Sequence, residues 1–400
     1  MNALLPMPIV LPLLGAALSI MAFRHRSVQR MISLAVLSST ATISCILLIQ
    51  ADTSGPVVAQ MSGWPAPFGI TLIADRLAGI MLAVAAVMLI SVLVYAIGQP
   101  GAERNHGAFH PVYLVLSAGV AAAFLTGDLF NLFVAFEMML TASYVLLTLG
   151  GGREQIRSGM TYVVISLVAS ALFLTSLALI YSATGTVNMA QLAERFGDLP
   201  NGVRLAFGLL LFVVFGIKAA LFPLFSWLPD SYPTAPSPIT AVFAGLLTKV
   251  GVYAIIRTQT LFLDPGTRPG TLILVVASIT MLVGVLGAIA SLVVALFFWL
   301  SRYNMLLADN DKFSGASFTD INASLPGRTI LAIAALLIGL LDKGRSPRST
   351  WRTMAVGTAM LCSVTLYGGL ASSAIALALL LVILAICSGI SVGVEQRAPQ

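Results

Sequence analysis

The sequence consists of long, uninterrupted runs of apolar residues separated by short polar segments. A helix needs about 20 such residues to cross the roughly 30 Å apolar core of a bilayer, and several of the runs reach that length. Hydrophobic residues make up 58% of the 400 residues and charged residues only 9%, which is too few to cover a water-soluble domain. The sequence therefore predicts an all-α, polytopic transmembrane helix bundle.

The apolar runs predict nine spans followed by a less regular C-terminal part. The nine spans lie at 2–22, 32–50, 76–98, 111–127, 129–149, 159–182, 204–222, 237–258 and 271–299. Further on, 329–341 is short for a span and 353–387 is long for a single upright one, so the topology after residue 300 stays open. We expect a divergent tail at 291–400 with a charged loop at 300–328 and one to three further membrane helices, giving about 10–12 spans in total.

Lysine and arginine residues favour alternate loops. Three arginines lie in the 23–31 loop, Arg104 follows the third span, and Arg153 and Arg157 follow the fifth, whereas the 51–75 loop has none. Because basic loops stay in the cytoplasm, this pattern predicts an external N-terminus. Four arginines fall on the opposite side in this arrangement: Arg195, Arg204, Arg257 and Arg268. The net charge of +6 is scattered, so we expect a lipid bilayer and no nucleic acid as partner.

Glu137 lies near the middle of the fifth predicted span. A charged side chain there costs about 2.5 to 3.5 kcal/mol on insertion scales, so Glu137 must face a partner or a wet cavity, or be protonated. Each of these conditions suits proton transfer. The alternative is a protonated glutamate that only hydrogen-bonds a neighbouring helix.

Two lysines lie in later spans, Lys218 in the seventh and Lys249 in the eighth. Pro223 and Pro229 follow Lys218 and predict a broken seventh helix, because proline lacks an N–H and clashes with the preceding turn. Broken helices are common binding positions in transporters. Glu137, Lys218 and Lys249 are therefore predicted to form a proton relay; the alternatives are a simple kink with a lysine that reaches the head groups, or a structural ion pair.

Other polar residues give weaker indications. Asp75, Asp128 and Asp230 lie at span ends, where a capping or loop role is favoured over gating. His106 and His110 have no partners at metal-ligand spacing, and no phosphate-binding or nucleophile motif is present, so neither a metal nor a cofactor is expected. The segment 188–195 predicts a short amphipathic helix within a loop.

Three segments carry a resemblance to a known family. Residues 133–147 around Glu137, 218–230 with both prolines, and 237–253 around Lys249 resemble the proton-translocating antiporter-like family. That family includes membrane subunits of respiratory complex I, of membrane-bound hydrogenases and of Mrp-type multisubunit sodium/proton antiporters. The three segments are most similar to the D-type subunits of Mrp antiporters.

The resemblance covers about residues 1–290. It implies a pair of inverted five-helix repeats, in which Glu137 is the fifth-helix glutamate, Lys218 the broken seventh-helix lysine and Lys249 the eighth-helix lysine, with Asp75 at the start of the third helix. The domain 1–290 would hold one complete repeat, the second being missing or truncated. The tail at 301–370 weakly resembles an uncharacterised family of bacterial multi-spanning membrane proteins.

These observations predict a membrane subunit of a multisubunit sodium/proton antiporter in a bacterial cell (inner) membrane. Its partners would be other antiporter subunits, with protons and sodium ions as substrates, and it would be a transporter subunit and no enzyme. One alternative is a proton-pumping subunit of a redox-driven complex of the NADH–quinone oxidoreductase or hydrogenase type. Another is a truncated or fused remnant that transports nothing.

Overall fold

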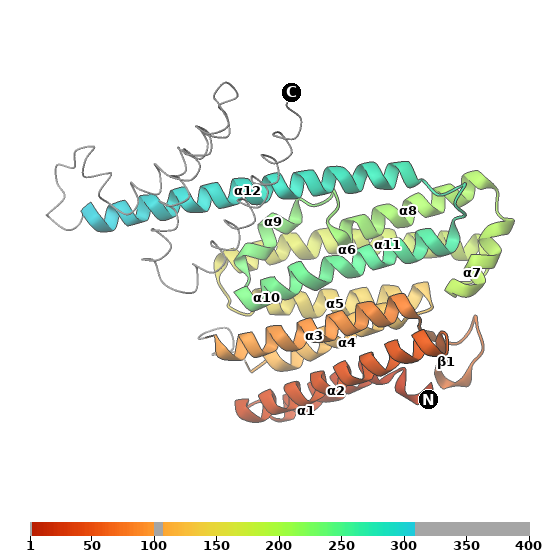
Figure 1. Cartoon of the computed structure of the whole chain (residues 1–400), viewed down its shortest axis with the longest axis horizontal. Helices are drawn as coiled ribbons and strands as arrows, with labels where there is room; N and C mark the ends of the chain where they lie inside the picture. Colours follow the sequence, from red (N-terminus) through yellow and green to blue (C-terminus); the bar gives the residue numbers. More distant parts are fainter. Residues whose placement is uncertain (1, 100–106, 309–400) are drawn as a thin grey trace, which may run out of the picture. The chain divides into compact units, whose positions relative to one another are not determined.

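The structure, a computed structural model, describes residues 2–99 and 107–308. The chain divides into two units, Met1–Val283 and Gly284–Gln400, and most of the described residues belong to the first (Figure 1). The second unit contains the last part of helix α12. The tail from residue 309, with most of the predicted charged loop and the further membrane helices, lies outside the described residues.

The nine predicted spans are confirmed as helices. They are α1 (Met7–Met21), α2 (Arg26–Thr53), α3 (Arg76–Gly98), α4 (Phe109–Leu125), α5 (Leu129–Thr148), α6 (Arg153–Thr184), α8 (Asn201–Ala219), α10 (Ser237–Val242) continuing into α11 (Thr248–Phe262), and α12 (Gly270–Ala308). In the described part of the chain, seven helices are long and apolar enough to cross a membrane, with α1 and α4 shorter. Two short helices, α7 (Met189–Arg195) and α9 (Trp227–Ser231), join longer ones.

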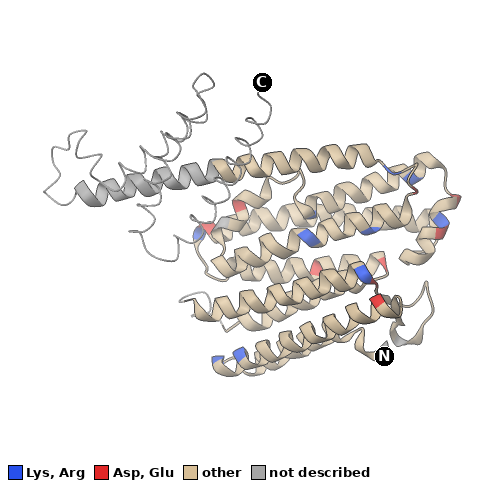
Figure 2. Ribbon diagram, in the orientation of Figure 1, with Lys and Arg blue, Asp and Glu red and all other residues tan. Residues whose placement is uncertain are grey.

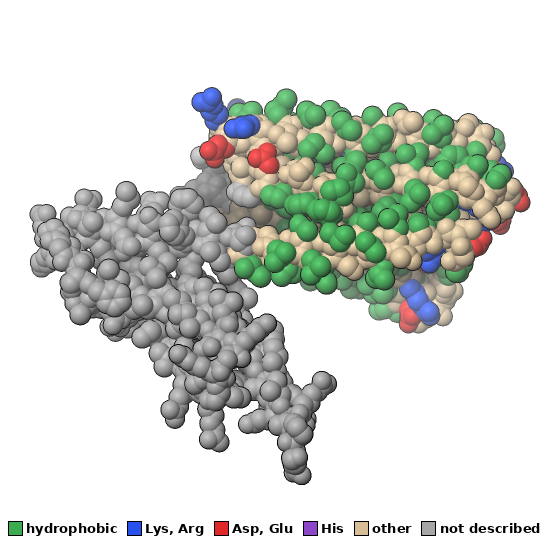
Figure 3. Space-filling view, turned by 90° about the horizontal axis from the view of Figure 1, so that it is seen from above, with side chains coloured by type: hydrophobic (Ala, Val, Ile, Leu, Met, Phe, Trp, Pro, Cys, Tyr) green, Lys and Arg blue, Asp and Glu red, His purple; other side chains and the backbone are tan. Residues whose placement is uncertain are grey.

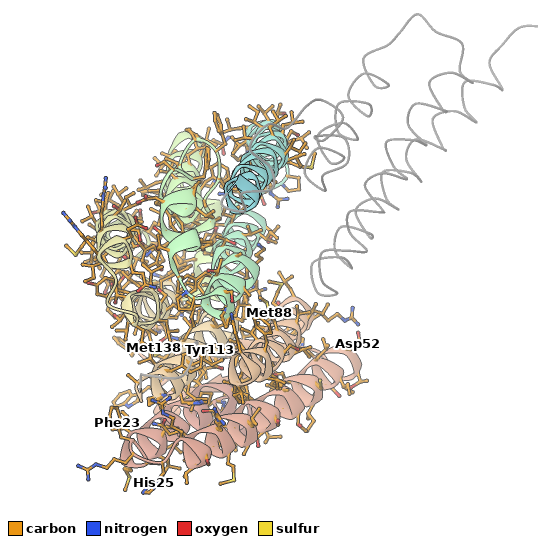
Figure 4. The ribbon with its side chains drawn as sticks, turned by 90° about the vertical axis from the view of Figure 1, so that its left-hand side faces the viewer. Phe23, His25, Asp52, Met88, Tyr113 and Met138 are labelled. Atoms are coloured by element: carbon orange, nitrogen blue, oxygen red, sulfur yellow. The ribbon has the colours of Figure 1, made fainter. Side chains whose placement is uncertain are left out.

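Helix α4 forms the core of the first unit. It packs against α1, α2, α3 and α5, and nearly every one of its residues is buried, as expected for a helix that is apolar on all sides. Tyr113 lies inside the bundle, where its hydroxyl donates to the carbonyl of Leu89 in α3 at 2.8 Å (Figure 4). A hydrogen bond of 3.0 Å between His110 Nδ1 and Ser33 Oγ joins α4 to α2. Both of these buried polar side chains on α4 therefore have a hydrogen-bond partner on a neighbouring helix.

The outer surface of the first unit matches a lipid environment. Charged residues gather at the two ends of the helices, with few between them (Figure 2). The face drawn in Figure 3 carries a broad apolar belt between these ends. Ile80, Val84 and Val87 of α3, for example, are 49%, 60% and 58% exposed. Such surface is stable only against lipid or a protein partner.

A small β-structure covers one end of the bundle, where the sequence predicted only a loop. Strands β1 (Val57–Gln60) and β2 (Thr71–Ala74) form an antiparallel hairpin that pairs Val57 with Ala74 and Gln60 with Thr71. The backbone of Gly127 donates to the carbonyl of Thr71 at 2.8 Å, and Asp128 forms a bridge with Asn188. Asn188 in turn caps α7, which confirms the predicted short helix. The connections before α3, α5 and α7 are thus joined by hydrogen bonds.

The predicted break in the seventh span is confirmed. Helix α8 ends at Ala219, and its C-cap residue Ala220 has a left-handed backbone with φ of 55°. Residues 222–226 then form turns that contain Pro223. Pro229 lies in the first turn of α9, where a missing N–H breaks no helical hydrogen bond. The predicted span of 204–222 is therefore three residues too long at its C-terminal end.

A second irregularity interrupts the eighth span. Between α10 and α11, residues Phe243–Leu247 adopt a π-helical turn. Such turns are rare and frequently occur at functional sites, because they redirect the side chains that follow. Gly245 of this turn packs directly against Met88 of α3, since a Cβ at position 245 would collide with the Met88 side chain (Figure 4).

Candidate functional site

Glu137 and Lys218 meet through a single hydroxyl group. The ammonium of Lys218 donates to Ser170 Oγ at 3.1 Å, and Ser170 Oγ donates to Glu137 Oε1. The three residues come from α8, α6 and α5. Glu137 lies eight residues into α5, roughly 12 Å from its start at 1.5 Å per residue. The structure therefore holds an acid and a base in one hydrogen-bonded chain inside the predicted membrane region.

The surroundings of Lys218 compensate its charge with polar and aromatic groups. Its ammonium also approaches the backbone carbonyl of Ser166 at 3.4 Å and lies 5.6 Å from the centre of the Phe136 ring. Carbonyl oxygens and aromatic faces both stabilise a desolvated cation. Trp227 Nε1 donates to the carbonyl of Ile217 at 3.1 Å, which satisfies one of the carbonyls at the end of α8. The break in the seventh span thus forms one wall of the lysine site.

A small cavity lies beside Lys218. Its volume is about 30 Å³. It is lined by Phe136, Met139, Leu140, Tyr162, Ser166, Ile217, Lys218, Trp227 and Leu247. A buried water needs about 10–15 Å³ of such space and two or more polar partners, so the cavity has room for one or two waters. The ammonium, hydroxyl and carbonyl groups on its wall supply the partners.

Lys249 is not part of the Glu137–Ser170–Lys218 chain. Its ammonium donates to the carbonyl of Ala244 in the π-helical turn and to Thr248 Oγ1 at 3.3 Å, and its side chain is exposed on α11. The two lysines are nevertheless on helices in close contact. A Cβ at Gly251 would lie 2.7 Å from the backbone nitrogen of Ala219, the residue after Lys218. Of the three residues of the predicted relay, Glu137 and Lys218 are therefore joined by hydrogen bonds through Ser170, and Lys249 is not.

Asp75 forms an ion pair with Arg257 that the sequence did not indicate. The guanidinium of Arg257, in α11, binds both carboxylate oxygens of Asp75, at 2.5 and 2.8 Å, and donates to the hydroxyl of Tyr253. Tyr253 donates onward to the carbonyl of Phe124 in α4 at 2.8 Å. Asp75 also caps α3 by accepting from the N–H of Ala78. Burial raises the pKa of Asp75, but the hydrogen bonds from Arg257 and Ala78 and the charge of Arg257 outweigh it, so this pKa lies below its ordinary value.

The remaining candidate residues lie apart from the lysine site. Asp128 caps α5 by accepting from the N–H of Asn131 at 2.9 Å, and burial raises its pKa although backbone hydrogen bonds oppose this. Asp230 is exposed in α9. His110 is buried against Ser33, and His106 lies outside the described residues. Among residues that the structure describes, no group of three histidine, cysteine or acidic side chains is arranged to bind a metal.

Comparison with known proteins agrees with the family resemblance of the sequence. Residues 126–294 match the family described as NADH:quinone oxidoreductase/Mrp antiporter, transmembrane, and this stretch contains the broken helix and all three predicted relay residues. The D-type subunit of the Na(+)/H(+) antiporter of Alkalihalophilus pseudofirmus is 46% identical over 293 residues, and that of Bacillus subtilis is 39% identical over 292. Each alignment covers 72% of this chain and 59% of the relative. This chain thus spans about three-fifths of the length of these relatives.

Chains in two solved membrane complexes are also similar to this chain. The Mrp complex from Dietzia sp. DQ12-45-1b contains a chain with a TM-score of 0.67 and 28% identity, covering 91% of this chain and 64% of that one. A chain of the membrane-bound sulfane sulfur reductase, an archaeal respiratory membrane complex, has a TM-score of 0.62 and 25% identity, covering 92% and 65%. Residues 231–379 also match an uncharacterised protein family, in agreement with the resemblance of the tail.

Proposed function

Because residues 126–294 of this chain match the NADH:quinone oxidoreductase/Mrp antiporter family, we propose that the chain is a membrane subunit that moves protons in exchange for a cation. The observation that carries the proposal is the chain of hydrogen bonds from Glu137 through Ser170 to Lys218. A carboxyl, a hydroxyl and an amine in sequence pass a proton without a large movement of any atom. A structural ion pair would gain from direct contact and would need no hydroxyl between the charges.

Lys249 is the next group in the proposed path. It lies one helix beyond Lys218, in the turn that follows the π-helical segment, and its exposed ammonium is available to a partner surface. In the proposed path, Lys249 follows Lys218 because their helices, α8 and α11, are in close contact. Asp75 and Asp230 stay outside this path, the first as a cap and ion-pair partner and the second as an exposed acid.

The proposed cation, partner subunits and location are inferred from the similar proteins. Both of the bacterial relatives above are named as subunits of Na(+)/H(+) antiporters, and the similar chain from Dietzia is part of an Mrp complex. We therefore assign sodium as the exchanged cation, other Mrp-type membrane subunits as partners, and the bacterial inner membrane as location, with the N-terminus external. This makes the chain a transporter subunit and no enzyme.

A redox-driven complex is the second candidate. The likeness to a chain of an archaeal respiratory membrane complex favours it, with the redox chemistry residing in other subunits. Purification of the chain from its own membranes separates the two candidates: antiporter subunits among the co-purified proteins support the first, and subunits that bind flavin or iron–sulfur clusters support the second.

The proton path is tested by substitution in membrane vesicles that contain the full chain and its partners. Glu137→Gln and Lys218→Ala are expected to lower sodium-dependent proton exchange by about 100-fold, the lower range for loss of a positioned proton-transfer group. Glu154→Gln, which changes an exposed acid in the first turn of α6, is the matched control and should leave the rate unchanged. Retention of exchange in both site variants would support the remnant alternative.

A further inference from the structure

Helix α6 carries a row of buried hydroxyl groups that the proposed path uses only at one end. Ser158, Tyr162, Ser166 and Ser170 follow each other at intervals of four residues and are 3%, 6%, 7% and 6% exposed. This spacing places all four on one face of the helix, over a length of roughly 18 Å. Ser170 is the residue that joins Glu137 to Lys218. The other three lead from this site toward the start of α6.

Tyr162 is the central member of this row. Its hydroxyl forms a hydrogen bond of 2.7 Å with Ser143 Oγ of α5, and the Ser166 side chain is a further hydrogen-bond partner. The centres of the Tyr162 and Trp227 rings are 5.4 Å apart. This ring contact holds the tyrosine in place and leaves its hydroxyl free for hydrogen bonds. A buried tyrosine hydroxyl held between two serines has a donor and two acceptor positions available, so it transmits a proton in either direction.

The cavity beside Lys218 separates this hydroxyl from the lysine. Tyr162, Ser166 and Lys218 all line it, and its volume of about 30 Å³ leaves room for one or two waters. A water there would accept from the Lys218 ammonium and donate to the Tyr162 hydroxyl or the Ser166 carbonyl. Phe136, Met139, Leu140 and Leu247 also line the cavity, and their side chains offer no competing polar group.

Beyond Tyr162, the row continues to the end of the bundle where α6 begins. Ser158 Oγ forms a hydrogen bond of 2.7 Å with Thr234 Oγ1, and Gln155 Nε2 donates to the Thr234 carbonyl at 3.0 Å. Ser231 Oγ approaches the Ser158 carbonyl at 3.4 Å. This polar cluster lies near Arg153, the first residue of α6, at the end of the bundle that the charge distribution assigns to the cytoplasm. The polar groups thus extend from that end to Lys218 along a single helix.

We propose that Tyr162 is a proton-relay residue that, with Ser143, Ser166 and water in the cavity, connects Lys218 to the end of the bundle at the start of α6. This inference rests on the proposed function, since it assigns a supply route to the same lysine. When Lys218 is neutral, the Tyr162 hydroxyl gives its proton through water to the lysine amine and takes another from the Ser143 hydroxyl, which regains its own proton from water at the end of the bundle where α6 begins. Tyr162 is unchanged at the end, and one proton has moved onto Lys218.

The test compares tyrosines on one helix in vesicles that contain the full chain and its partners. Tyr162→Phe removes the hydroxyl and keeps the ring against Trp227, and it is expected to lower the rate of proton exchange at least tenfold. Tyr181→Phe, at a position of α6 that is 56% exposed, should leave the rate unchanged. Ser166→Ala should lower the exchange rate as well, whereas Ser166→Thr, which keeps a hydroxyl, should retain the rate of the unaltered chain. If Ser166 had only a structural role, the rate would not depend on the presence of a hydroxyl at this position.

A second measurement does not depend on transport. A cryo-EM map of the full chain that resolves ordered waters is expected to show density between Lys218 Nζ and the Tyr162 hydroxyl. A dry cavity, or an unchanged exchange rate in Tyr162→Phe, would overturn the relay. If Glu137→Gln still abolishes exchange while Tyr162→Phe has no effect, the relay fails and the proposed function stands; if the unaltered chain moves no protons, both fail.

Discussion

The ion pair between Asp75 and Arg257 gives a direct test of how the first unit is held together. Arg257→Gln removes the cation and leaves a shorter, neutral polar side chain. It leaves the Asp75 carboxylate with its N-cap hydrogen bond from Ala78 and no charged partner. It also removes the two donors to the Tyr253 hydroxyl, at 3.2 and 2.9 Å. Helix α11 then loses its polar connection to the start of α3.

The expected size of the effect follows from the burial of the pair. Removing one partner of a buried ion pair costs about 3–5 kcal/mol, because the remaining charge is left without compensation. The Arg257 and Asp75 side chains are 12% and 24% exposed, so water reaches part of the carboxylate. We therefore expect the low end of that range, about 3 kcal/mol, which is a more than 100-fold change in the folding equilibrium.

The assay is denaturant unfolding of the full chain in mixed micelles, with a double-mutant cycle through Asp75→Asn and the double variant. A coupling energy of about 2–3 kcal/mol is expected, within the range measured for residues of one network. The control is Arg76→Gln, since the Arg76–Asp52 pair is 71% and 65% exposed and should contribute about 1 kcal/mol or less. Equal losses in Arg257→Gln and Arg76→Gln would refute the reasoning.

The pH dependence of the same pair has a defined sign. The pKa of Asp75 is lower in the folded protein than its ordinary value of 3.8, so the carboxylate binds protons less tightly when folded. Its contribution to stability is therefore complete above that value and is lost as the pH falls through the lowered folded pKa. The difference in stability between the unaltered chain and Asp75→Asn should accordingly be constant near neutral pH and shrink only below pH 3.8.

Two further substitutions test local features. Asp128→Asn keeps a good helix cap and removes a carboxyl group whose pKa is raised by burial. The ionised carboxylate is unfavourable in the folded chain, so this variant should be more stable by up to about 1 kcal/mol at neutral pH. The same unfolding assay should show that the gain disappears in acid, where Asp128 is protonated. Gly251→Ala places a Cβ against the Ala219 backbone and should cost about 1–3 kcal/mol, whereas Gly202→Ala, in open space on α8, should be neutral or slightly stabilising; a neutral Gly251→Ala would contradict the close packing of α8 and α11.

The membrane helices were predictable because lipid imposes a simple requirement on the sequence. A span must be apolar over a sufficient length, and the runs at 76–98 and 129–149 meet this condition almost residue for residue with α3 and α5. The break after Lys218 was also predictable, since Pro223 cannot continue a helix. The β-hairpin was missed because its two strands are only four residues each and depend on pairing with each other and with residues far along the chain.

The site was predictable only in part. Depth in an apolar run identified Glu137 and Lys218, but the hydroxyl of Ser170 that joins them has no distinguishing pattern among the many serines of the sequence. Charge counting placed Arg257 as an exception to the loop rule, but it gave no indication of the partner, Asp75, which lies 182 residues earlier in the chain. The π-helical turn before Lys249 depends on tertiary packing, so the periodicity of the sequence gave no indication of it.

The early end of α8 has an electrostatic consequence for Lys218. The peptide dipoles of a helix add up to about half a negative charge at its C-terminus, and this effect is confined to the last turn. Lys218 is the second-to-last residue of α8, so it belongs to the last turn of a helix that ends inside the predicted membrane region. In low dielectric, this partial negative charge helps to compensate a cation in the lysine site. The proline that ends α8, Pro223, thereby also shapes the electrostatic surroundings of Lys218.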